Sequence, residues 1–185
     1  MKKINYLAAI ALIAVVIGCT GNPDQPDKTA IKDAGKTNQK NIPSDTLKKR
    51  LIRAGELEVS GKNMAELHSY FDTANFRFHG PDKRESNYAQ LNSYFRSYRA
   101  AFDDLSIKRG LMISEGNYIA CQTWIEGTFA RPFTLAPYGK IPPNKHRVIR
   151  ELMNIFRFDD QGRLVEEWVQ LDNRSYLRQL GVEAK

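Results

Sequence analysis

The chain has 185 residues, a formal net charge of +7 at pH 7 and two cysteines. Its basic residues are spread along the sequence, with no basic run interleaved with aromatic residues, which indicates a solvated surface rather than a nucleic-acid interface. The sequence has no glycine-rich phosphate loop, no His-Glu-x-x-His pair, no Gly-x-Ser-x-Gly elbow and no cysteine cluster, which argues against a nucleotide site, a metal site and a serine hydrolase.

Residues 1–18 have the pattern of a bacterial signal peptide. Lys2 and Lys3 precede an almost continuous apolar run over residues 4–17. This run is shorter than the roughly 20 apolar residues that a membrane-spanning helix needs. It ends in Val16-Ile17-Gly18-Cys19, which resembles the lipobox of bacterial lipoproteins.

The lipobox resemblance implies that the chain is cut before Cys19 and that Cys19 carries the lipid. Several acyl chains on one residue attach a protein stably to a membrane. We therefore expect a lipid-anchored protein of the cell envelope, at the outer membrane and facing the periplasm or the outside if the host is Gram-negative. An ordinary secretory signal with a chance cysteine, or a plain anchor helix, is the alternative.

Residues 19–43 predict a disordered tether. The segment is rich in Asp, Lys, Asn, Gln, Gly, Pro and Thr, and such a composition does not bury enough apolar surface to offset the entropy of ordering. As a flexible coil it would hold the following domain about 25–30 Å from the bilayer. Residues 44–185 then suit one domain with one hydrophobic core.

The first part of this domain is predicted to be mainly helical. Asn63, followed three residues later by Glu66, is typical of a capping box at the start of a helix. Ser44 and Ser86 are candidate caps for two further helices with apolar residues at helical spacing. The predicted elements are a helix from Ser44 to Val59, a helix from Asn63 to Phe71, a strand over 76–79 and a helix from Ser86 to Phe102.

Alternating apolar and polar residues predict strands in the second part. Helices followed by an antiparallel meander predict an α+β fold. Cys121 lies within one of these strands, where we expect a small buried side chain without a catalytic role. The predicted elements are strands over 105–113, 118–128, 148–158 and 163–171, turns at 115–117 and 159–162, and a closing helix over 175–180.

The last predicted strand brings a carboxylate and an indole to one face. Trp168 and Asp172 are four residues apart and share that face with Glu166 and Gln170. An aspartate in a partly apolar cavity has a raised pKa and becomes a usable proton carrier. The alternative is that Asp172, or Asn173 beside it, caps the closing helix and that Trp168 is a core residue.

Several stretches of the domain follow one another in the order seen in a known family. They are Phe76-Arg77-Phe78-His79-Gly80-Pro81, Phe102-Asp103-Asp104-Leu105, Glu115-Gly116-Asn117-Tyr118 with Trp124 and Gly127-Thr128, Ile155-Phe156-Arg157-Phe158, Asp160-Gln161-Gly162-Arg163, Glu167-Trp168 with Asp172, and Gln179-Leu180-Gly181. Over residues 63–181 the chain therefore resembles the SnoaL-like polyketide cyclase or ester cyclase group of the nuclear transport factor 2-like superfamily.

This resemblance implies a cone-shaped fold, in which a curved antiparallel sheet packs on N-terminal helices and leaves a pocket at its open end. It implies that Asp172 is the acid and base on a carbon next to carbonyl groups, and that His79 donates a hydrogen bond to the developing oxyanion. It also implies aromatic pocket walls at Trp124 and Trp168, and chemistry without a metal or another cofactor.

The chain departs from the family in the loop expected to shape the ligand. Phe129-Ala130-Arg131 stands where the family often has His-x-Gly, and Pro143-Asn144-Lys145-His146 where it often has Pro-Thr-Gly-Lys. We expect Phe129 and Arg131 to contact the ligand in place of a histidine at the pocket rim, with Arg131 as an anion-seeking group.

Two functions are consistent with the sequence. The first is a cofactor-independent cyclase, isomerase or dehydratase that acts on a small apolar carbonyl compound in the envelope. The second is a non-catalytic module that binds a small ligand or forms a homodimer through its sheet. A deep cavity with Asp172 and His79 pointing inward favours the first, and Asp172 capping a helix beside a filled core favours the second.

Overall fold

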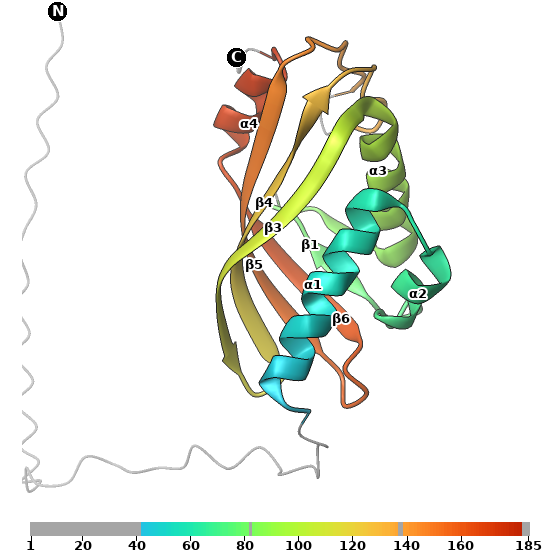
Figure 1. Ribbon diagram of the computed structural model, residues 1–185, viewed down its shortest axis with the longest axis vertical. Coiled ribbons are helices and arrows are strands. Elements are labelled where there is room, and N and C mark those ends of the chain that lie inside the picture. The colour runs from blue at the N-terminus through green and yellow to red at the C-terminus, as the bar shows by residue number, and fades with distance from the viewer. Residues whose placement is uncertain (1–41, 82, 137–138, 183–185) are drawn as a thin grey trace, which may run out of the picture. The chain divides into compact units, whose positions relative to one another are not determined.

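The computed structural model describes residues 42–81, 83–136 and 139–182 (Figure 1). The predicted signal peptide, its lipidated Cys19 and nearly all of the predicted tether lie outside these residues. Among the described residues, no helix is long and apolar enough to cross a membrane. The elements are α1 (Ser44–Ser60), α2 (Met64–Ser69), β1 (Arg77–His79), β2 (Glu85–Asn87), α3 (Tyr88–Ala101), β3 (Phe102–Glu115), β4 (Tyr118–Phe129), β5 (Arg147–Phe158), β6 (Leu164–Gln170) and α4 (Asn173–Gln179).

One sheet with the strand order β2-β1-β6-β5-β4-β3 forms the frame of the domain. Strands β3 to β6 are an antiparallel meander, as predicted. The sequence did not predict that β1 pairs with β6 in parallel, or that β2 pairs with β1. The predicted α+β class is confirmed.

Side-chain caps set where two of the helices begin. Asn63 accepts a hydrogen bond from the backbone N–H of Glu66 at 3.2 Å, as the capping box predicts. Helix α3 is capped by Asn87 together with Gln90, and not by Ser86. The reason is that Ser86 belongs to strand β2, where it pairs with Phe78, so the helix starts one residue later.

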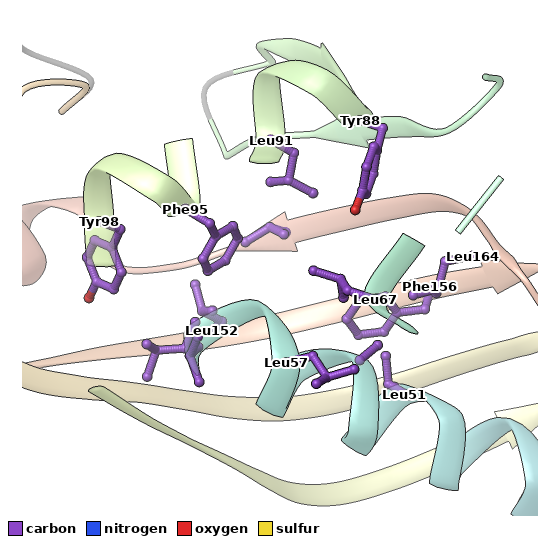
Figure 2. Packing of buried hydrophobic residues seen from close by; sticks show 14 of the residues in the cluster. Leu51, Leu57, Leu67, Tyr88, Leu91, Phe95, Tyr98, Leu152, Phe156 and Leu164 are labelled. Carbon is purple, nitrogen blue, oxygen red and sulfur yellow. The ribbon is translucent and has the colours of Figure 1, made fainter. Parts of the chain in front are cut away.

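The three N-terminal helices cover one face of the sheet, which we call the inner face (Figure 1). Figure 2 shows Leu57 of α1 and Phe95 of α3 pointing toward Leu152 of β5, and all three side chains are buried. Strand β4 alternates strictly between buried and half-buried residues because its two faces meet different surroundings. The opposite face, which these three helices leave uncovered, is called the outer face below.

Two register shifts bend strand β3, one between Asp103 and Ser106 and one between Arg109 and Met112. Bulges of this kind increase the local twist and redirect side chains. The second shift comes directly after Arg109, whose guanidinium turns to the inner face and comes close to α1 at Gly55. A Cβ atom on Gly55 would lie 3.0 Å from Nη2 of Arg109, so the glycine leaves room for this guanidinium.

Candidate active site

A cavity of about 140 Å³ is lined by residues of the helices and of the inner face of the sheet. Part of its lining is apolar and includes Phe78 of β1, Phe95 of α3 and Ile107 of β3. Cavities of this kind, mostly apolar with a few convergent polar groups, are the usual form of a small-molecule site. The charged and amide residues of the lining include Glu58, Arg109, Arg150, Asn154 and Glu167.

Glu167 of β6 projects into the cavity from the inner face. The next inward residues along this strand, Val169 and Leu171, also line the cavity. Asn154 of β5 donates from Nδ2 to Oε1 of Glu167 at 2.7 Å. Burial raises the pKa of Glu167 to about 7, although the charge of Arg109, the bond from Asn154 and the charge of Arg150 act in the opposite direction. This carboxyl therefore exchanges its proton near neutral pH.

Glu58 brings a second carboxyl to the cavity from helix α1, where it lies between the buried residues Leu57 and Val59. Burial raises its pKa to about 8, and the nearby carboxylate of Glu167 raises it further, against the charges of three arginines that include Arg109. At neutral pH Glu58 is therefore mainly a neutral carboxylic acid, which donates a hydrogen bond.

Arg109 of β3 holds a fixed positive charge beside these carboxyls. Its Nη1 donates to Oγ1 of Thr123 at 2.5 Å, and its guanidinium lies 5.1 Å from the centre of the Phe156 ring. Its buried Nε has no hydrogen-bond partner among the described residues.

Arg150 of β5 is the second guanidinium in the cavity. It lies 5.5 Å from the ring centres of both Tyr94 and Tyr176. Among the described residues, no three His, Cys, Asp or Glu side chains gather closely enough to hold a metal ion. The carboxyls of the cavity can transfer protons, and its guanidiniums can donate hydrogen bonds.

Asp172 lies outside the lining of this cavity. It is the N-cap of α4, and its Oδ1 accepts from the backbone N–H of Ser175 at 2.9 Å. It borders a separate depression together with Ile149 and Met153. The structure thus places Asp172 where the alternative interpretation expected it, as a helix cap.

His79 and Trp168 lie on the outer face, stacked with their ring centres 5.2 Å apart. The Nε2 atom of His79 is 2.8 Å from Oε1 of Glu166, and Oε2 of the same carboxylate accepts two hydrogen bonds from Arg157. The structure does not bring His79 and Asp172 together in the cavity. The reason for His79 is strand alternation, because its neighbour Phe78 is the residue of β1 that points inward.

The three other expected ligand contacts also lie away from the cavity. Trp124 is half-buried on the outer face, where its ring covers Gly110 so closely that a Cβ there would lie 2.6 Å from it. Phe129 is fully buried and stacks on Phe102 with ring centres 5.0 Å apart. Arg131 is bound to Asp103 at 2.6 Å and is half exposed.

The sequence profile of the SnoaL-like polyketide cyclases matches residues 51–180, which include every strand and nearly all of the helices. The chain belongs to this family. No curated protein sequence matches it significantly.

Solved structures of the same fold agree with this membership. AclR from Streptomyces galilaeus is 20% identical, with a TM-score of 0.59, and the match covers 75% of this chain and 98% of AclR. TsrD from Streptomyces laurentii is 21% identical, with a TM-score of 0.58, over 74% of this chain and 93% of TsrD. A SnoaL-like polyketide cyclase from Agrobacterium tumefaciens is 20% identical, with a TM-score of 0.55, over 73% and 98%. At such identities the similarity shows the fold alone.

The charged cavity residues of this SnoaL-like domain were missed by the analysis of the sequence. They do carry a signal, because each is a charged residue inside a run of inward-facing apolar positions. Arg150 lies between the buried residues Val148 and Leu152, and Glu167 precedes Val169 and Leu171 on the same strand face. A buried charge is costly unless something pairs with it, so charges in such positions indicate a site.

Proposed function

We propose that the domain is a cofactor-independent enzyme that moves a proton on a carbon next to a carbonyl group, with Glu167 as the acid and base. One observation carries the proposal. Two carboxyls, Glu58 and Glu167, share one partly apolar cavity and have pKa values raised to about 8 and about 7. A pair of carboxyls whose pKa values are raised and separated supplies an acid and a base at the same pH.

The proposed reaction begins when ionised Glu167 removes a proton from the carbon. The electron pair of the broken C–H bond moves to the carbonyl oxygen and forms an enolate, while Glu167 becomes protonated. Protonated Glu58 donates a hydrogen bond to this oxygen, and the charge of Arg109 stabilises it further. The enolate then attacks a second carbonyl within the same molecule, which closes a ring and leaves an alkoxide that takes the proton from Glu167. Alternatively, the enolate takes this proton back at another carbon, which isomerises the compound. Ring closure is the reaction that the name of the family supports.

The experiment follows hydrogen–deuterium exchange at the acidic carbons of 2-tetralone by NMR in D2O, with further cyclic ketones as additional probes. Glu167→Gln keeps the size of the side chain but removes the base, so the exchange rate should fall by about 10²–10⁴-fold. Glu58→Gln keeps a hydrogen-bond donor, so its exchange rate should fall less than that of Glu167→Gln. Glu151→Gln is the matched control, because Glu151 is an exposed glutamate. Equal exchange in wild type and Glu167→Gln would contradict the proposal and favour a non-catalytic ligand-binding module.

We also propose that two copies of the domain associate through the outer face of the sheet. Large apolar side chains are exposed there, including Leu111 (66%), Ile113 (62%), Met153 (54%) and Ile155 (47%). Strand pairing aligns Ile113 with Ala120 and Ala120 with Ile155, so the patch is continuous across three strands. Contiguous exposed apolar surface of this kind is typical of an interface. Ile113→Lys combined with Ile155→Lys should convert a dimer to a monomer in sedimentation velocity, and unchanged sedimentation would refute this interface.

We propose further that the chain is anchored to a membrane of the cell envelope through Cys19. The support is the sequence alone, an apolar run that stops at Val16-Ile17-Gly18-Cys19. In this arrangement the cavity would take small carbonyl compounds from the envelope.

A further inference from the structure

Arg150 is a half-buried residue whose guanidinium lacks the hydrogen-bond partners that such a group normally has. Its Nε is buried without an acceptor, and among the described residues no side chain or backbone oxygen forms a hydrogen bond or a salt bridge with it. Its contacts there are the faces of Tyr94 and Tyr176. A guanidinium has five N–H donors in one plane and remains charged at any physiological pH. The buried Nε is left without an acceptor, which is unfavourable and indicates that an acceptor for this guanidinium arrives from outside the chain.

Hydrogen bonding uses the edge of this guanidinium, because its N–H groups point outward in its own plane. The guanidinium carbon lies 5.5 Å from the ring centres of Tyr94 and Tyr176, and these are cation–π contacts and not hydrogen bonds. The Oη atom of Tyr176 is also buried without a partner among the described residues. A planar anion with two oxygens, such as a carboxylate, matches this edge through two parallel hydrogen bonds.

The groups of the cavity itself do not satisfy this charge. Neither Glu58 nor Glu167 forms a salt bridge with Arg150, although all three line the same cavity. Glu167 is bound instead by Asn154. The cavity lining therefore includes three guanidiniums, those of Arg84, Arg109 and Arg150, and only one carboxyl that is substantially ionised at neutral pH, and this balance of charge favours an anion.

We propose that the cavity binds an apolar compound that carries a carboxylate, and that Arg150 receives this carboxylate by its guanidinium edge between Tyr94 and Tyr176. This deepens the proposed function, because it defines the class of carbonyl compound on which Glu167 acts. The apolar part of the compound contacts Phe95 and Leu91, which line the same cavity. Anion recognition holds the compound by one end and leaves its other end to the acid and base.

The experiment compares two probes of nearly equal shape, 2-naphthoate and its neutral amide 2-naphthamide, by isothermal titration calorimetry at pH 7.5. Wild-type protein should bind the carboxylate at least about tenfold more tightly than the amide, because hydrogen bonds to a charged group are the stronger ones. Arg150→Met keeps much of the volume and should abolish this preference while the affinity for the amide stays. Arg150→Lys keeps the charge without the planar edge and should retain only part of the preference. Arg131→Met removes an exposed arginine outside the cavity and should change nothing.

Equal affinity of wild type for the two probes, or an undiminished preference in Arg150→Met, would overturn the proposal, as would a lack of naphthoate binding. Far-ultraviolet circular dichroism verifies that the variants fold, and Arg150→Lys tests the site if Arg150→Met does not. Glu167→Gln separates this proposal from the proposed function. It should lose proton exchange and keep the preference for naphthoate, so failure of catalysis and failure of anion binding are distinguishable.

Discussion

Asn154 donates a hydrogen bond from Nδ2 to Oε1 of Glu167, and the two atoms are 2.7 Å apart. The donor is on β5 and the acceptor on β6, and the register pairs Asn154 with Val169 and Phe156 with Glu167, so the bond runs diagonally across two strands. Because Asn154 is only 2% exposed, it binds the carboxyl from inside the domain and leaves the cavity side of Glu167 open to a ligand.

Removal of this donor should raise the pKa of Glu167 further. Asn154→Leu deletes a bond that favours the ionised carboxylate and increases the apolar surface around it, and both effects stabilise the protonated form. NMR titration of the Glu167 carboxyl measures the shift. Gln170→Leu, at an exposed position on the outer face of the same strand, is the control and should leave this titration unchanged. A lower pKa in Asn154→Leu would contradict the assigned hydrogen bond.

The two cavity carboxyls should make the domain less stable as the pH rises from 4.5 to about 8. In the unfolded chain both groups lose their protons near pH 4.5, whereas in the folded chain they keep them up to about pH 7 and pH 8. Within this window the folded state binds more protons, so the free energy of unfolding falls with rising pH and becomes constant above it. Each carboxyl should contribute about 1–3 kcal/mol to the fall.

Thermal melting between pH 5 and pH 9 tests this dependence. Glu167→Gln should flatten the part of the curve below pH 7, and Glu56→Gln, which changes an exposed glutamate, should not. The carboxyls of Glu66, Asp72, Asp103 and Glu166 have lowered pKa values, so their contribution is lost only as the pH falls below the ordinary carboxyl range. A melting temperature that rises from pH 5 to pH 8 would show that Glu58 and Glu167 do not titrate as described.

Asp172 should matter for stability and not for proton transfer. As the N-cap of α4 it satisfies the backbone N–H of Ser175, so Asp172→Ala should cost about 1 kcal/mol of unfolding free energy. Asp172→Asn caps nearly as well and should leave stability almost unchanged. Both variants should retain the 2-tetralone exchange of wild type. Loss of exchange in a folded Asp172→Asn protein would return the catalytic role to Asp172.

Cys19 should be the site of lipid attachment. Cells labelled with tritiated palmitate should incorporate the label into wild-type protein and not into Cys19→Ser, which should also keep its signal peptide. Cys121→Ser is the matched control, because Cys121 is a buried free cysteine within β4 and should not affect labelling. Equal incorporation into wild type and Cys19→Ser would exclude this anchor.

The fold could be predicted largely because each of its signals is local. The alternation of β4 and the Asn63–Glu66 box act within a few residues, and both appear in the structure as expected. The strand β2 was missed because its three residues have no periodicity of their own and form a strand only by pairing with β1. The parallel pair of β1 and β6 joins segments far apart in the sequence, which no local pattern reveals.

The candidate site was predicted less well than the fold. Alternating apolar and polar residues define the two faces of a strand, but they do not show which face the helices cover. Trp168 was expected to face the pocket because it shares a strand face with Asp172 and because the family resemblance implies an aromatic wall there. In the structure it is half-buried on the outer face, where the ring of His79 covers it across the β1–β6 pair. The helices cover the face of Val169 and Leu171, and Glu167 lies on that face. His79, Trp124 and Trp168 therefore lie on the opposite side of the sheet from the cavity, whereas Phe129 is buried in the core and Asp172 caps α4.

Strand β1 meets β6 through only three residue pairs, and one of them joins Phe78 to Glu167. The chain between β1 and β6 is long, so bringing these two strands together is slow and entropically costly. A pairing of only three residues offsets little of this cost, so the β1–β6 pair should form late in folding and open first. Opening of β1 would move Phe78 and uncover the acid and base while the meander stays intact. Ligand entry would then follow the opening rate of one short strand pair, and backbone amides of residues 77–79 should exchange with deuterium faster than those of β4 and β5.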